Sequence, residues 1–125
     1  MDGFATSRID DLPQIWDGWA KLVRNGLGIT SFACNVIDVP PSTRCLDHTE
    51  VTSGQEELYT ALSGEGTLLI GVGDDADAER VVVSPETVTR VAAETRRRFL
   101  SGPAGCRLLV VGGTPGQVFT AVDLT

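Results

Sequence analysis

The chain has 125 residues, of which 42% are hydrophobic and 22% charged. This is enough for one domain with its own core, and the composition excludes a disordered chain. The net charge of −7 argues against a nucleic-acid partner, which needs a basic face, and against an anionic membrane surface. Three cysteines are scattered without metal spacing, and no apolar leader precedes them, so we expect reduced thiols in the cytoplasm.

The first element predicted is a helix over Pro13 to Val23, in a lead that covers residues 1–28. Its apolar positions recur at offsets of three and four: Trp16, Trp19, Ala20 and Val23. Asp11 is a candidate cap, and Gly26 and Gly28 end the pattern. We expect a surface helix pinned by its two Trp rings. The alternative is that Trp16 or Trp19 closes the mouth of a pocket.

Short β-capable runs follow, separated by turns. Ile29 to Val39 is expected as a strand that Pro40-Pro41 ends. The stretch GQEELYTALSG, residues 54–64, predicts one arm of a hairpin whose loop is residues 63–66 and whose second arm is residues 67–70. An acidic loop over Gly71 to Glu79 has the character of a solvated hairpin tip and lacks the spacing of an EF-hand.

Four more β-like runs complete the predicted core: Arg80 to Val83, Thr87 to Val91, Arg96 to Leu100 and Arg107 to Gly112. One of the turns between them is expected over Ser101 to Gly105. Short strands separated by turns at regular intervals predict an all-β antiparallel sandwich or barrel. A tail over Gln117 to Thr125 follows.

The order of these pieces resembles a small single-domain bacterial cupin over about residues 29–116. The resemblance rests on Pro40-Pro41, on GQEELYTALSG, on the run from Val88 to Phe99 that ends in TRRRF, and on LLVVGGTPG. It implies one domain over residues 1–125, with an antiparallel double-stranded β-helix, the jelly-roll barrel, and a short N-terminal helix.

The resemblance also implies positions for metal ligands, usually three His and one Glu. Laid on this chain, the first two His fall on Glu50 and Thr52, the Glu on Glu57, and the third His on Arg97. The chain has one histidine, His48, so a site with two imidazoles cannot form within one subunit. We therefore predict no metal cofactor. A weaker alternative is a zinc site in which Cys34, Cys45 and His48 are the ligands.

If this register holds, Glu50, Thr52, Glu57 and Arg97 point into one barrel, where Arg97 pairs with Glu57 or Glu50. That pair is either a plug or a site in which Arg97 binds a ligand carboxylate, phosphate or enolate oxygen. In the second case Glu57, Arg97 and Glu50 are the candidate catalytic residues, with a glutamate as general acid or base. The candidate ligand-binding residues are Thr52, Tyr59, Arg97, Phe99 and His48.

The sequence thus favours a metal-independent cupin that acts on or binds a small organic molecule in the barrel interior, as a cyclase or isomerase does. A non-catalytic binding or structural cupin is the alternative, and a metal-dependent oxygenase is a third class. A roomy interior with paired carboxylates and an accessible Arg97 indicates the enzyme, whereas a filled interior, or an apolar pocket without a titratable pair, indicates the alternative. We expect a homodimer that pairs through edge strands, as small cupins commonly do.

Overall fold

The computed structural model describes residues 3–71 and 74–116, so the predicted tail lies outside the described residues. Its elements are the 3₁₀ turn η1 (Ile9–Asp11), β1 (Gln14–Ile15), β2 (Ala20–Leu22), α1 (Val23–Leu27), β3 (Ala33–Val39), β4 (Glu56–Ile70), β5 (Glu79–Val83), β6 (Thr89–Val91) and β7 (Arg97–Gly113). The fold is mostly β and antiparallel, with one short helix, as predicted. The helices in the described ranges are too short to span a bilayer.

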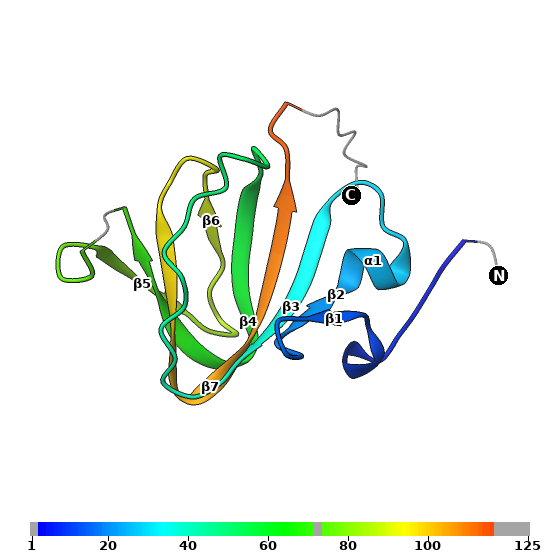
Figure 1. Cartoon of the computed structure of the whole chain (residues 1–125), viewed down its shortest axis with the longest axis horizontal. Coiled ribbons are helices and arrows are strands. Elements are labelled where there is room, and N and C mark those ends of the chain that lie inside the picture. The colour runs from blue at the N-terminus through cyan, green and yellow to red at the C-terminus, as the bar shows by residue number, and fades with distance from the viewer. Residues whose placement is uncertain (1–2, 72–73, 117–125) are drawn as a thin grey trace.

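The strands form one sheet in the order β1-β2-β3-β7-β4-β5, and β6 pairs with β4 off this path. The long strands β4 and β7 pair over most of their length and bend together at the bottom of the view in Figure 1, so that their halves enclose an interior. Side chains from both strands fill that interior, including Tyr59, Leu68, Phe99 and Leu108. The interior is therefore a packed core.

The predicted hairpin loop at residues 63–66 and the predicted turn at residues 101–105 are both wrong. These segments lie opposite each other as a bulged bend in β4 and β7, with register shifts between Ala61 and Ser63 and between Gly64 and Gly66. Gly64 has a φ of 70°, and a Cβ there would meet the backbone of Gly105. Glycine at a bulge and glycine at a turn give the same local pattern, which explains the error.

The predicted helix over residues 13–23 is also wrong, because the helix covers only Val23–Leu27. Trp16 and Asp17 have φ near 55° and Gly18 has 87°, so a tight turn joins β1 to β2. The dipeptide Asp17-Gly18 is a hairpin signal, and pairing of β2 with β3 outweighs the helical periodicity. Trp16 is exposed and Trp19 packs against the core. Neither ring lines the pocket described below.

Two connecting segments position the site. Residues 43–52 make isolated antiparallel bridges to β7, Arg44 to Leu100 and His48 to Arg97, and so run alongside the first half of that strand (Figure 1). The acidic loop joins β4 to β5 as a hairpin, as predicted. It is held to the barrel rather than simply solvated, because Asp75 pairs with Arg44 and Arg98.

Candidate functional site at the mouth of the barrel

Arg97 begins β7 and points into the barrel. Its exposed fraction is 1%, while Arg96 is exposed and Arg98 is partly exposed. The three arginines thus alternate between the two faces of the strand, as successive side chains of a β-strand do. Because a buried guanidinium is costly without acceptors, its surroundings have to provide them.

Four protein oxygens accept hydrogen bonds from Arg97. Nη2 donates to Glu57 Oε1 at 2.7 Å, and Nε donates to the hydroxyl of Tyr59 at 3.3 Å. Nη1 donates to the backbone oxygens of Ala92 at 3.2 Å and Thr95 at 2.8 Å. The predicted ion pair with Glu57 is thus confirmed. Burial alone lowers the pKa of Arg97, but the bonds to Tyr59 and Glu57 outweigh it and raise the pKa, so the charge is permanent.

Tyr59 lies two residues beyond Glu57 on the same inward face of β4. Its hydroxyl donates to Glu57 Oε1 at 2.8 Å and accepts from Arg97. Burial, followed by the neighbouring charge of Glu57, raises the pKa of Tyr59, so the phenol stays protonated at neutral pH. One oxygen of Glu57 is therefore held by two donors. Its other oxygen has no hydrogen bond to the described residues.

Three further polar side chains, those of His48, Glu50 and Ser53, lie at the rim near this cluster. His48 Nε2 is 3.3 Å from Glu50 Oε2, and Ser53 Oγ is 3.1 Å from Glu50 Oε1. One donor atom from each of His48, Glu50 and Glu57 lies within 4.8 Å of the other two. The side chains of His48 and Glu50 are 44% and 26% exposed, against 14% for Glu57. Glu50 makes no ion pair with Arg97 in the part of the chain that the structure describes.

Two residues predicted to bind ligand lie elsewhere. Thr52 was expected to point into the barrel, but it is exposed in the turn over residues 51–54, which the bond from Gly54 N–H to Glu50 O closes. Phe99 is 5% exposed and belongs to the packed core. The alternative zinc site is not formed in the described ranges, because the residues that gather around His48 are glutamates rather than Cys34 and Cys45.

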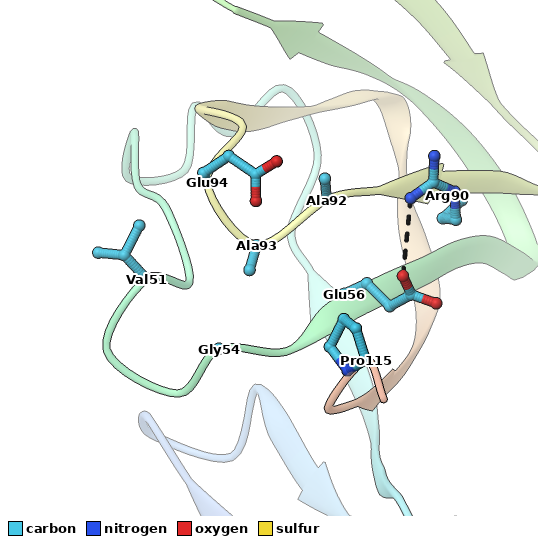
Figure 2. Close-up of a pocket in the computed structure, with 8 residues that line it drawn as sticks. All are labelled: Val51, Gly54, Glu56, Arg90, Ala92, Ala93, Glu94 and Pro115. Carbon is cyan, nitrogen blue, oxygen red and sulfur yellow. Dashed lines mark ion pairs between the residues drawn. The ribbon is translucent and has the colours of Figure 1, made fainter. Parts of the chain in front are cut away.

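Sequence reasoning missed a pocket on the outer side of the rim, with a volume of about 450 Å³. Figure 2 shows it between the turn over residues 51–54, the segment of residues 90–94 and Pro115. Glu94 and Glu56 lie on opposite sides of it, and Arg90 turns towards Glu56, with 3.6 Å between the charged atoms. Glu56 and Glu57 are adjacent on β4 and therefore face opposite sides of the sheet.

Comparisons with known proteins give a structural answer only. No protein-family model and no curated protein matches the chain. A cupin protein from Bacteroides fragilis superposes with a TM-score of 0.73 at 16% identity, over 98% of this chain and 93% of that one. The chain has the cupin fold. The cupin domain of Cnp3 from Schizosaccharomyces pombe gives a TM-score of 0.56 at 15% identity, over 69% of this chain and 55% of that one.

Oxalate decarboxylase from Bacillus subtilis gives a TM-score of 0.62 at 14% identity, and the match covers 79% of this chain but 25% of the decarboxylase. At such identities the cupin likeness carries over the fold and not the reaction.

The metal-ligand set that the cupin resemblance implies does not fit this chain. Of its four positions, Thr52 lies in an exposed turn and Arg97 places a guanidinium, already paired with Glu57, where an imidazole is expected. A fixed positive charge at that position repels a cation. We therefore assign no chemistry to that set.

Proposed function

We propose that this cupin binds a small organic molecule at the mouth of its barrel, and that the molecule presents hydrogen-bond donors or a positive charge, as amines and polyols do. The proposal places the ligand at Glu50 and Glu57, above the packed interior. The ligand class differs from the one expected from the sequence. There, Arg97 was expected to bind an anionic oxygen of the ligand, whereas here two carboxylates bind a cationic or hydrogen-bond-donating ligand.

The observation that carries this proposal is the contrast in exposure between Arg97 and the groups above it. Arg97 is 1% exposed, and its hydrogen bonds go to protein oxygens. The groups that a ligand reaches first are the carboxylates of Glu50 and Glu57 and the ring of His48. Carboxylates accept hydrogen bonds and attract cations, so a carboxylate or phosphate ligand would meet repulsion at this mouth.

A second candidate function is acid–base catalysis on the same molecule. The observation that favours it is the second oxygen of Glu57, which makes no hydrogen bond to the described residues while Tyr59 and Arg97 hold the first. A carboxylate held in this way is well placed to move a proton on a bound hydroxyl or amine. Whether the protein is an enzyme, and whether it acts without a metal, both stay predictions.

The test is ligand binding followed by NMR in the presence of EDTA, so that the result does not depend on a bound metal. The ring of His48 gives one set of imidazole signals, because the chain has one histidine. We expect small amines and polyols to shift these signals and small carboxylates and phosphates to leave them unchanged. Preferential binding of the anions would refute the proposal.

Two matched variants sharpen the test. Glu50→Gln removes a mouth carboxylate and is expected to weaken binding of the best amine at least about tenfold, because charged hydrogen bonds contribute about 1.5–3 kcal/mol. Asp47→Asn removes a carboxylate that pairs with Arg96 outside the cluster, and it should bind as the wild type does. Equal weakening by both substitutions would indicate a general charge effect and would contradict the site.

A further inference from the structure

The pocket on the outer side of the rim has no part in the proposed function. Its walls are the turn over residues 51–54, the segment of residues 90–94 and Pro115, and its volume is about 450 Å³. Ligand pockets usually measure about 300–1,000 Å³, so a small organic molecule fits this space. Because Glu56 lines the pocket and its neighbour Glu57 faces the other side of β4, the pocket and the mouth of the barrel are separate places.

Hydrogen bonds hold the walls of the pocket in place. Glu50 N–H donates to the backbone oxygen of Ala93 at 2.8 Å, and Gly54 N–H donates to the backbone oxygen of Glu50 at 2.8 Å. From inside the barrel, Arg97 Nη1 donates to the backbone oxygen of Ala92 at 3.2 Å. The pocket is therefore formed before a ligand arrives, which lowers the entropic cost of binding.

The middle of the pocket is apolar and its ends are charged. Ala92 is half-buried, and Val51, on the turn that makes the facing wall, is 62% exposed. An apolar ligand body that covers Val51 removes this surface from water. Figure 2 shows Glu94 at one end of the pocket and the pair of Glu56 and Arg90 at the other, with Ala92 between them.

The two charged ends differ in what they offer a ligand. Arg90 balances the charge of Glu56, with 3.6 Å between the charged atoms. Glu94 is exposed, and its carboxylate makes no ion pair with the residues that the structure describes. Two carboxylates against one guanidinium give the lining a net charge of −1. Arg90 therefore does not oppose a cation at the Glu94 end, because Glu56 beside it carries the opposite charge.

We propose that this outer pocket binds an amphipathic organic cation, with its ammonium group at Glu94 and its apolar body against Val51, Ala92 and Ala93. The ammonium group gains a charged acceptor, and the body covers apolar surface. A bare metal ion has no apolar body, and an anion meets the charge of Glu94 while Arg90 is already paired. The proposal goes beyond the proposed function and holds whether or not a molecule binds at the mouth.

The test is NMR titration of nitrogen-15-labelled protein with phenethylamine, 2-phenylethanol and 3-phenylpropionate. These probes share a phenyl ring on a short alkyl linker and are positive, neutral and negative. We expect phenethylamine to shift the amide signals of Val51, Gly54, Ala93 and Glu94 most. The alcohol should shift them less, and the carboxylate should leave them unchanged.

Three variants locate the binding. Glu94→Gln should weaken phenethylamine binding at least about threefold, because a pair of exposed charges contributes modestly. Glu86→Gln removes an exposed carboxylate outside the pocket and should bind as the wild type does. Ala93→Leu fills the middle of the pocket and should remove the shifts there, while any shift of the His48 ring at the mouth remains.

Each contrary result has a definite meaning. Equal affinity for the three probes, preference for 3-phenylpropionate, or equal weakening by Glu94→Gln and Glu86→Gln would overturn the proposal. Shifts confined to the His48 ring and lost in Glu50→Gln would place the amine at the mouth alone. That outcome would overturn the outer site and support the proposed function, so the two proposals fail separately.

Discussion

Arg97 and Arg107 lie on the same strand, β7, and face opposite sides of it. Arg97 has an exposed fraction of 1% and meets one carboxylate, that of Glu57. Arg107 has a side chain that is 29% exposed and meets two, with a two-pronged contact to Asp38 at 2.8 and 3.0 Å and a third contact to Asp10 at 2.6 Å. Lys21 also pairs with Asp38, at 2.8 Å.

The number of ion pairs is therefore a poor guide to how much each arginine contributes to the stability of the fold. Around Arg107, water competes for every charge, and such pairs are typically worth about 0.2–1 kcal/mol. Around Arg97, removal of one partner leaves a largely buried carboxylate and phenol unsatisfied. Burial decides which region stabilises the fold, and it also decides which groups a ligand can reach.

The largest expected effect comes from comparing Arg97→Met with Arg107→Met. Loss of the buried partner should lower the free energy of unfolding by about 3–5 kcal/mol, whereas loss of the exposed one should lower it by about 1 kcal/mol. Chemical denaturation of both variants and the wild type measures the difference. Equal destabilisation, or a larger effect at Arg107, would contradict the claim that burial decides which arginine stabilises the fold.

A smaller effect is expected at Glu57, where Glu57→Gln removes the charge and keeps the shape. We expect a loss of about 1–3 kcal/mol, because a buried charge-assisted hydrogen bond becomes a neutral one. The matched control is Glu56→Gln on the outer face, whose side chain is 44% exposed, and it should change stability by less than about 0.5 kcal/mol. If Glu56→Gln destabilised the protein as much as Glu57→Gln does, burial of the carboxylate would not explain the loss of stability.

Next is the pH dependence at Asp38. Its hydrogen bond from Arg107 holds the pKa of Asp38 below the usual 3.8, with a smaller contribution from Lys21. The folded state then binds this proton less readily than the unfolded state does. The stabilisation is therefore fully present above about pH 4 and is lost as the pH falls through the folded pKa.

Unfolding of the wild type and Asp38→Asn at pH 6 and pH 3 measures this contribution. Because the side chain of Asp38 is 33% exposed, we expect the wild type to lose about 1 kcal/mol more than the variant over this range. Equal losses of stability in the two proteins would mean that the ion pairs of Asp38 with Arg107 and Lys21 do not contribute to the pH dependence of stability.

The smallest effect concerns a residue next to Arg107 that faces inward. Burial raises the pKa of the Cys106 thiol to about 11, and the charge of Glu65 adds to this. At pH 8 the thiolate fraction is then on the order of a hundredfold below that of a free cysteine, whose pKa is about 8.5. Mass spectrometry should show Cys106 alkylated far more slowly in the native protein than in the unfolded chain. Similar alkylation rates in the two states would show that Cys106 is accessible to the reagent in the folded protein.

Much of this arrangement could be predicted from the sequence, because it follows from local alternation. The opposite orientations of Arg96 and Arg97, the pairing of Arg97 with Glu57 and the antiparallel β fold all follow from period-two patterns and the cupin motif. The errors have local causes too. Trp16 and Trp19 fit a helical period, while the left-handed turn at Asp17-Gly18 allows a hairpin.

What the sequence could not provide is non-local. The bulged bend of β4 depends on its pairing with β7, across some forty residues of chain, as in the register of Gly64 with Cys106. Thr52 leaves the expected inward face because a turn closes on Glu50. His48 reaches Glu50 and Glu57 because its backbone bridges Arg97, a contact that no local pattern indicates.

The central claim is that Arg97 is locked inside the barrel and is not a ligand contact. Nitrogen-15 NMR of the arginine side chains at neutral pH tests it directly, with the neighbouring Arg96, 50% exposed, as the internal reference. We predict that the Nε proton of Arg97 exchanges with water much more slowly than that of Arg96 and that its guanidinium nitrogens give separate signals. Exchange as fast as that of Arg96, with averaged guanidinium signals, would contradict the account.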